Sequence, residues 1–196
     1  MKNDMLDCNV IKFFGINTRS GKVLYPLLVR WEFPSPGCVK INIDGQNIGY
    51  PGLATCWRYF PCLYRGVYWW FFCVYWGLDF FGCWVLWSYI CMEEAQKMGL
   101  TNVWLECDYV LVSGAFTART KVSWMLHNRW NTCLNYCRKI RFRVTHIFRE
   151  GNACADKLTN LGFIHRDFFH WYNRFPSSIF LEFFMNMYSL PMYRFC

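Results

Sequence analysis

The sequence predicts an α/β domain in which an antiparallel meander of strands is extended by strand–helix crossovers. Three segments, 38–45, 102–108 and 141–148, alternate apolar and polar residues, as half-buried strands do. Two others, 83–98 and 123–140, place their apolar residues at helical spacing. Strands followed by helices in this way favour a sheet with parallel strands, whose carboxyl ends are the usual place for a ligand.

The first elements lead into the meander. Residues 1–30 show no strong period, and we interpret them as an N-terminal extension or linker. The segment 31–37, WEFPSPG, contains two prolines and a glycine, which indicates the entrance to a folded unit. Turn residues follow the strand in 38–45, and two aromatic segments then predict further strands, around 56–64 and 67–76.

The second half of the chain alternates helices and strands. Gly99 stands where a helix C-cap is expected, and Ser123 and Asn152 stand where helix N-caps are expected. The predicted elements are a helix over 83–98, a strand over 102–108, a short helix over 110–117, a longer helix over 123–140, a strand over 141–148 and a helix from 153 to 162.

The composition indicates a basic, cysteine-rich chain. There are 21 Lys and Arg against 13 Asp and Glu, and the formal net charge of +8 favours a polyanionic partner without identifying it. The 12 cysteines include no C-x-x-C pair and fall mostly in apolar segments, so we expect reduced, buried thiols. The charged start, MKNDMLDCNV, predicts no secretory signal peptide and a nuclear or cytoplasmic location.

An aromatic run over residues 66–92 suggests a membrane alternative, because Asp79 is its only charged residue. A membrane-spanning helix needs about 20 consecutive apolar residues, and Gly77 and Asp79 divide this run into pieces of roughly 11 and 13. Buried strands and helices are commoner at those lengths. Membrane association through residues 66–92 is therefore the less favoured interpretation.

Three aspartates fall where a metal site could form. Asp44 and Asp108 stand at the carboxyl ends of predicted strands, and Asp156 lies at the start of the last predicted helix. Carboxylates from separate elements are the ligands that Mg²⁺ prefers, and two ions about 4 Å apart can assist phosphoryl transfer. The alternative is that the three are solvated loop or helix-cap residues.

Several segments, taken together and in order, resemble the ribonuclease H-like domain of plant non-LTR retroelement-derived proteins. They are WEFPSPG, KINIDG, WLECD, SWMLHNRWNTC, VTHIFREGNACADKL and SLPMYRF, which extend from residue 31 to the end of the chain. The resemblance implies a ribonuclease H-like fold, with a mixed five-stranded sheet flanked by helices. It also implies a ribonuclease H-like domain over residues 31–163 and a tail of the same family over 164–196.

The resemblance further implies metal-dependent hydrolysis of the RNA strand of an RNA–DNA hybrid. Asp44, Asp108 and Asp156 would hold two Mg²⁺ or Mn²⁺ ions, and with His146, placed near the scissile phosphate, they would form the catalytic set. The fourth acidic ligand of the family, a glutamate, falls on Trp84. We therefore expect weakened metal binding and strongly slowed catalysis, and a binding module without catalysis is the alternative.

The expected partner is an RNA–DNA hybrid, bound by a monomer that needs no small-molecule cofactor. Such hybrids are recognised through backbone shape and 2′-hydroxyls, so little sequence preference is expected. The alternative for each basic side chain is an ordinary solvated surface. The candidate nucleic-acid-binding residues are Lys139, Arg141, Arg143, Arg149 and Asn152.

Overall fold

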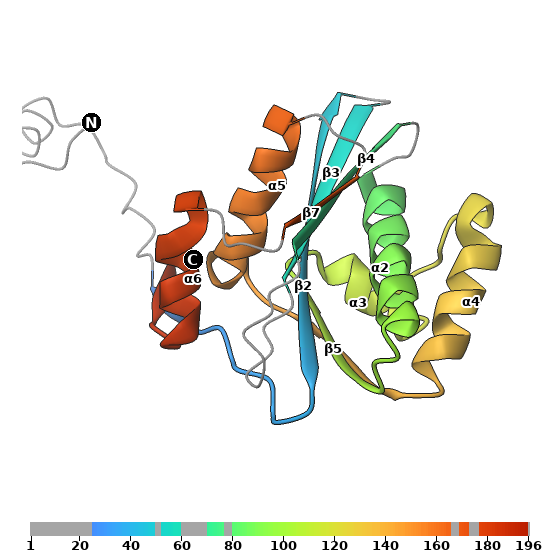
Figure 1. Ribbon diagram of the computed structural model, residues 1–196, viewed down its shortest axis with the longest axis horizontal. Helices are drawn as coiled ribbons and strands as arrows, with labels where there is room; N and C mark the ends of the chain where they lie inside the picture. The colour runs from blue at the N-terminus through green and yellow to red at the C-terminus, as the bar shows by residue number, and fades with distance from the viewer. Residues whose placement is uncertain are drawn as a thin grey trace, which may run out of the picture.

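A six-stranded sheet runs through the centre of the described part of the protein, with helices on both of its faces (Figure 1). The computed structural model describes residues 25–49, 52–59, 70–76, 80–165, 169–172 and 177–195. The strands of the sheet are β2 (Val39–Gly49), β3 (Gly52–Tyr59), β4 (Trp70–Trp76), β5 (Asn102–Cys107), β6 (Arg141–His146) and β7 (Phe169–Tyr172). Their order across the sheet is β6-β5-β2-β3-β4-β7.

The strand directions confirm the predicted α/β class with a meander and parallel strands. Strands β2, β3, β4 and β7 pair antiparallel, whereas β2, β5 and β6 pair parallel. The sheet has six strands among the described residues and not the predicted five, because β7, from the predicted tail, pairs with β4. Strand β2 also continues to Gly49, through residues that the sequence indicated as a turn.

The helices divide between the two faces of the sheet. Helices α2 (Phe80–Lys97), α3 (Val110–Phe116) and α4 (His127–Cys137) cover one face, and α5 (Ala153–His165) covers the other (Figure 1). Short 3₁₀ turns precede three of the helices: η1 (Trp124–Leu126), η2 (Arg149–Asn152) and η3 (Ser177–Ile179). Each expected helix of the second half is thus present, with bounds that differ by a few residues.

A second, two-stranded sheet lies beyond α5. Strand β1 (Pro26–Val29) pairs antiparallel with β8 (Met192–Phe195), and helix α6 (Phe180–Met187) precedes β8. The sequence predicted none of these three elements, because short segments carry too little periodicity to identify them. The pairing joins a segment before residue 31 to the end of the chain, while the domain boundaries remain a prediction.

The largest apolar cluster of the described residues lies between the sheet and helices α2 and α4. Trp87 and Cys91 of α2 are fully buried against Ile41 and Ile43 of β2 and Leu105 of β5. The expected reduced, buried cysteines are confirmed for the six that are buried and unpaired: Cys83, Cys91, Cys107, Cys133, Cys137 and Cys154. Among the described residues, no helix has both the length and the apolar character that crossing a membrane requires.

On the opposite face of β2 and β5, a buried ion pair joins the two strands. The Lys40 ammonium is fully buried, lies 2.7 Å from Glu106 Oε2 and donates to the Glu32 carbonyl at 2.8 Å. The ammonium also lies over the rings of Trp31 and Trp104, at 4.2 and 4.0 Å from their centroids. Burial lowers the pKa of Lys40, against the opposing effect of Glu106.

Asn42 extends this pair into a hydrogen-bonded network. Its amide nitrogen donates to Glu106 Oε2 and to Asn152 Oδ1, and its oxygen accepts from the Trp31 indole. Asn152 in turn donates to the Ile43 carbonyl at 2.9 Å. The network therefore fixes η2, and with it the start of α5, against the first half of β2.

We predict that Glu106→Gln lowers the free energy of unfolding by about 3–5 kcal/mol, because it leaves the Lys40 charge buried without its partner. Adding Lys40→Met should restore more than half of that loss, since the uncompensated charge is then removed. The measurement is urea denaturation followed by circular dichroism.

The matched control is Glu94→Gln, which breaks the solvent-exposed Lys97–Glu94 pair and should lower the free energy of unfolding far less, because water and salt screen exposed ion pairs. A loss for Glu106→Gln no larger than that of Glu94→Gln would show that the buried pair contributes little to stability.

Candidate active site

Asp44 and Asp108 follow paired residues of two neighbouring parallel strands. Ile43 of β2 is in register with Cys107 of β5, and each is followed directly by an aspartate. The side chains of Lys40, Asn42 and Asp44 alternate with those of the apolar core, so Asp44 continues the polar row that contains the buried ion pair. The structure thus brings these two predicted site residues together where the β2–β5 pairing ends. Asp44 itself lies within β2, which continues to Gly49, so its predicted place at the end of a strand is wrong.

Asp44 is buried, with 6% of its surface exposed. Burial, and then the charge of Asp108, raises the pKa of Asp44 from 3.8 to about 7. A hydrogen bond from Thr159 and the Arg149 charge act in the opposite direction, while Asp156 adds to the rise. In the described part of the structure, the positive charge around Asp44 is therefore too small to stabilise its carboxylate form.

Asp108 lies just after β5 and is less deeply buried. Burial raises the pKa of Asp108 to about 6, with a further contribution from Asp156, and the Arg149 charge opposes the rise. Its Oδ1 atom is buried and has no hydrogen-bond partner among the described residues. A buried carboxylate oxygen of this kind is suited to accept a cation.

Asp156, in the first turn of α5, is engaged differently. Its Oδ1 accepts from Arg149 Nε at 2.8 Å and from Arg149 Nη2, so the two side chains form an ion pair. Its charge raises the pKa values of Asp44 and Asp108, which places it within electrostatic range of both. Asp156 is close to the other two aspartates, but its carboxylate is already neutralised by an arginine.

His146 stands at the end of β6, beside Asp108. Its exposed ring places Nε2 3.1 Å from the Asp108 carbonyl oxygen and packs edge-on against Phe148, with 5.4 Å between the ring centroids. The register of β5 and β6, in which Cys107 pairs with His146, sets this position. The structure therefore brings His146 to the rim of the same strand ends as the aspartates.

Trp84, on α2, fills the space next to Asp44 on the other side of the sheet. The indole is 3% exposed, and a Cβ at Gly45 would lie only 3.2 Å from one of its ring atoms. Its ring also packs on Tyr109, with 5.5 Å between the centroids. Gly45 and Tyr109 are the residues that directly follow Asp44 and Asp108, so an apolar ring closes this side of the strand ends.

The donor set is only partly suited to a metal ion. No group of three His, Cys, Asp or Glu side chains is arranged to hold an ion in the ranges that the structure describes. Asp44 and Asp108, with raised pKa values and a buried carboxylate oxygen lacking a partner, have the chemistry of cation ligands. Asp156 fits only if it leaves Arg149, and Trp84 offers no ligand atom.

The predicted nucleic-acid-binding residues lie in different surroundings. Arg149 is paired with Asp156 at the strand ends, whereas Arg141 and Arg143 begin β6 at the opposite end of the sheet. Lys139 is exposed just before β6. Asn152 is 1% exposed and uses its amide within the protein, so its place is in the structural network and not on the surface.

Two partners of the site were absent from the sequence prediction. Thr159 hydrogen-bonds Asp44 from one turn further along α5 than Asp156, and Glu106 anchors the strand that carries Asp108. A polar residue at every second position of KINID was a signal for the Lys40 network, because such a row must be solvated or paired. Nothing in the sequence indicated that Arg149 pairs with Asp156.

Known proteins share both sequence and fold with this chain. A family model described as reverse transcriptase-like matches residues 89–162. The curated "Putative ribonuclease H protein" of Arabidopsis thaliana is 28% identical over 159 residues, which make up 78% of this chain and 25% of that protein. The chain therefore spans about a quarter of the length of this relative.

Solved structures decide the fold. RNase H1 from the halophilic archaeon Halobacterium salinarum has a TM-score of 0.57 at 19% identity, over 65% of this chain and 98% of that one. The N-terminal RNase H domain of a Mycobacterium tuberculosis protein has a TM-score of 0.57 at 20% identity, over 65% and 94%. The chain has a ribonuclease H-like fold. The resemblance seen in the sequence motifs is thereby confirmed at the level of a ribonuclease H-like domain.

We predict that this ribonuclease H-like domain becomes less stable as the pH rises from about 4 to about 7 without divalent cations. The unfolded chain loses the Asp44 proton near pH 4, whereas the folded chain keeps it to about pH 7. Over that range the folded state binds more protons, so its free energy of unfolding falls with pH. Asp44→Asn should remove about 1–3 kcal/mol of this fall.

The measurement is urea denaturation in EDTA at several pH values between about 4 and 8. The control is Glu93→Gln, on the half-exposed surface of α2, which should leave the slope of stability against pH unchanged. If Asp44→Asn shows the same slope as the unmodified chain, the raised pKa of Asp44 is wrong.

Proposed function

We propose that this chain is a nucleic-acid-binding ribonuclease H-like domain for RNA–DNA hybrids, with weak divalent-metal binding and strongly reduced RNA-strand cleavage. The observation that carries the proposal is a pair of aspartates with raised pKa values: the buried Asp44 within β2, at about 7, and the half-buried Asp108 just after β5, at about 6. Titratable groups perturbed in this way by burial and by neighbouring carboxylates are typical of functional sites. Because this chain matches only 25% of its curated relative, the activity of any whole protein is left to experiment.

Asp44 and Asp108 would hold the cation, Mg²⁺ or Mn²⁺, with Asp156 as a third ligand once Arg149 moves away. A bound divalent cation supplies Lewis-acid stabilisation of the charge that develops on phosphate oxygens and lowers the pKa of a bound water. His146 stands at the exposed rim, beside the Asp108 carbonyl, where it can exchange a proton with a phosphate or a leaving hydroxyl. Arg149 keeps the site partly neutral when no cation is bound.

Trp84 accounts for the reduced activity in this proposal. Its buried indole lies against Gly45, beside Asp44, where the family resemblance places a carboxylate. Replacing an anionic ligand by an apolar ring removes one charge from the site and excludes water from that side. Weaker cation binding follows, and with it a slower reaction.

Basic side chains supply the proposed contacts with the hybrid. Lys139, Arg141 and Arg143 are exposed around the start of β6, and Arg149 is exposed beside the aspartates. Such contacts act on phosphates and depend on salt rather than on sequence. Support for a hybrid as the partner comes from LC11-RNase H1, solved in complex with an RNA/DNA hybrid, which has a TM-score of 0.53 to this chain at 21% identity.

A binding module without catalysis is the second candidate. Two observations favour it: Trp84 provides no ligand atom, and Arg149 occupies Asp156. In this case the fold and the basic side chains would be used to bind a hybrid, and the aspartates would remain as buried, partly protonated acids. The two candidates differ only in whether a cation and the hydrolysis of phosphate are involved.

We predict that Trp84→Glu increases cleavage of a labelled RNA–DNA hybrid in Mg²⁺ or Mn²⁺ by at least about 10-fold, and that Asp44→Asn reduces any cleavage to background. Trp84→Gln, similar in size but not anionic, is the matched control and should show no gain. Because Trp84 is a core residue, each variant is first compared by its thermal unfolding with and without the cation.

Cation-dependent thermal stabilisation in the unmodified chain, lost in Asp44→Asn, would support metal binding apart from activity. If Trp84→Glu gains nothing and Asp44→Asn loses nothing, the catalytic proposal is refuted. Hybrid binding that persists in that event would favour the non-catalytic module.

We predict that Lys139→Ala weakens hybrid binding about uniformly across sequences and lowers the slope of log K against log salt by about 1, because one phosphate contact is lost. The measurement is fluorescence anisotropy at several salt concentrations. Lys97→Ala removes the same charge from a lysine that is paired with Glu94, and it should leave the slope unchanged. Equal slopes for the two variants would place Lys139 outside the interface.

A further inference from the structure

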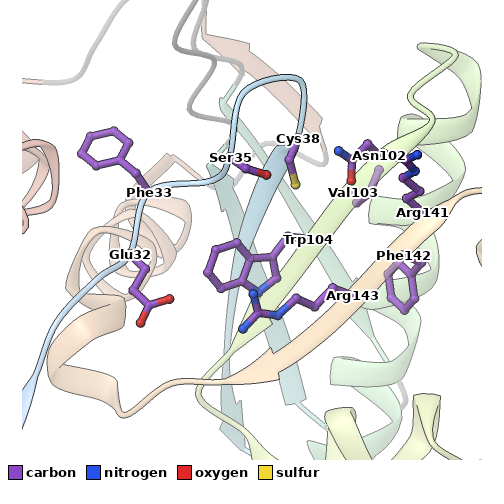
Figure 2. Close-up of a pocket in the computed structure, with 10 residues that line it drawn as sticks. All are labelled: Glu32, Phe33, Ser35, Cys38, Asn102, Val103, Trp104, Arg141, Phe142 and Arg143. Atoms are coloured by element: carbon purple, nitrogen blue, oxygen red, sulfur yellow. The ribbon is translucent and has the colours of Figure 1, made fainter.

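A pocket of about 360 Å³ opens at the amino-terminal ends of β2, β5 and β6. Its residues come from those strands and from the segment before β2, as Figure 2 shows: Trp104 stands in the middle, with Glu32 and Phe33 on one side and Asn102 and Arg141 on the other. A volume of this size lies within the range of small-molecule sites. The pocket is therefore large enough for a nucleotide-sized ligand.

The pocket is separate from the aspartates. Asn102 begins β5 and Asp108 follows its last residue, so the two lie about 20 Å apart at roughly 3.3 Å per residue. The pocket opens at the start of the parallel strands, whereas Asp44 lies farther along β2 and Asp108 follows the end of β5. A ligand in this pocket would not touch the aspartates, but it would use Arg141 and Arg143, which the proposed function assigns to contacts with the hybrid. The inference rests on the pocket and not on that function.

One wall of the pocket is a tight turn. The Cys38 amide donates to the Ser35 carbonyl at 2.9 Å, and Gly37 between them has a φ of 78°. Pro36 before a glycine with positive φ is the pattern of a type II turn, which is stiff because proline fixes its own φ. Ser35 and Cys38 line the pocket from this turn, so the wall is formed before any ligand arrives.

Two arginines give the pocket its charge. The guanidinium groups of Arg141 and Arg143 form no ion pair or hydrogen bond with the described residues. Arg143 lies over the Trp104 ring, 4.2 Å from its centroid, and the other side of that ring faces Lys40. An arginine already placed over an aromatic ring loses less side-chain freedom when it binds a ligand.

The remaining charges leave the pocket positive. Glu32 is the acidic side chain of its lining, against two arginines. Burial raises the pKa of the Cys38 thiol, in spite of the nearby charges of Arg143 and Lys40. That thiol therefore stays neutral near pH 7 and adds no negative charge. The lining thus favours an anion while still offering Glu32 as a hydrogen-bond acceptor.

The distribution of the lining matches the parts of a nucleotide. Arg141 can bind a phosphate in two-point fashion, as guanidinium groups do. A base can stack on the Arg143 guanidinium, which points away from Arg141 in Figure 2 and already lies over the Trp104 ring. Glu32 can accept from sugar hydroxyls, and Asn102 can both donate to and accept from a base edge.

We propose that this pocket binds a nucleoside monophosphate, either free or as the 5′-terminal nucleotide of a strand. Phosphate alone would use Arg141 but leave the aromatic and polar lining without contacts. A nucleoside alone would leave Arg141 without an anion. The complete ligand is therefore expected to bind more tightly than either part.

The test is isothermal titration of the full chain with AMP in EDTA, which keeps metal binding at the aspartates out of the measurement. We expect a Kd on the order of 10–1000 µM, and affinities at least about 10-fold weaker for inorganic phosphate and for adenosine. Arg141→Ala should weaken AMP binding by at least about 10-fold. Arg143→Lys keeps the charge but loses the stacking plane, and it should weaken AMP more than inorganic phosphate.

The matched control is Arg138→Ala, an exposed arginine that bonds Asn135 outside the pocket and whose loss should leave the AMP affinity within about 2-fold. Competition by a 5′-phosphorylated oligonucleotide, but not by its 5′-hydroxyl form, would identify a strand end as the source. AMP binding without such competition would identify free nucleotide. No binding of either ligand, equal affinity for phosphate and AMP, or an Arg141→Ala variant that is folded and binds AMP normally would overturn the proposal.

Discussion

The buried pair of Lys40 and Glu106 is the interaction on which the rest of the structure depends. A fully buried ammonium is costly, and it is tolerated only where carboxylate, carbonyl and aromatic rings surround it completely. The contacts around this ion pair bring five segments together: β2, β5, β6, the loop that carries Trp31, and the turn η2. Thr145 joins β6 to Glu106, and Asn42 and Asn152 join η2 to β2. Because η2 leads into α5, which carries Asp156, the network around the Lys40–Glu106 pair also determines where Asp156 lies relative to Asp44.

Farther along the same face of the sheet the charges are not balanced. The buried Asp44 and the half-buried Asp108 lie within electrostatic range of each other, and the single nearby cation among the described residues, Arg149, is shared with Asp156. A network whose charges are all paired stabilises the fold. A cluster of unpaired charges destabilises the protein without a ligand, and a ligand that neutralises those charges recovers this free energy on binding. The contrast between Glu106, with its three donors, and Asp108 Oδ1, with none, separates structural acids from candidate functional ones.

Local patterns in the sequence were sufficient for the elements that carry the aspartates. KINID and WLEC alternate because one side faces the α2 core, and so Asp44 and Asp108 could be placed on neighbouring strands in advance. The end of β2 could not, because the strand continues to Gly49 through residues typical of a turn. Pairings between distant residues could not: nothing local distinguishes Arg149 as a partner of Asp156, or Asn152 as a buried amide rather than a surface contact. The β1–β8 pair was also missed. Its two strands are separated by most of the chain, and strands of four residues carry almost no period.

The alternation of strands also explains why the two candidate sites lie on one face of the sheet. Lys40, Asn42 and Asp44 project to the same side of β2, as Asn102, Trp104 and Glu106 do on β5 and Arg141, Arg143 and Thr145 do on β6. From the amino to the carboxyl end of the parallel strands, that face carries first Arg141 and Arg143, then the Lys40–Glu106 ion pair, and last the aspartates, whose charges are not balanced. The indole of Trp104 lies under Arg143, donates to Thr145, and Thr145 donates to Glu106, so the pocket and the buried pair share one hydrogen-bonded row. Opposite charges at the two ends of this face attract different ligands, so the proposed anion near the arginines and the proposed cation near the aspartates would not compete.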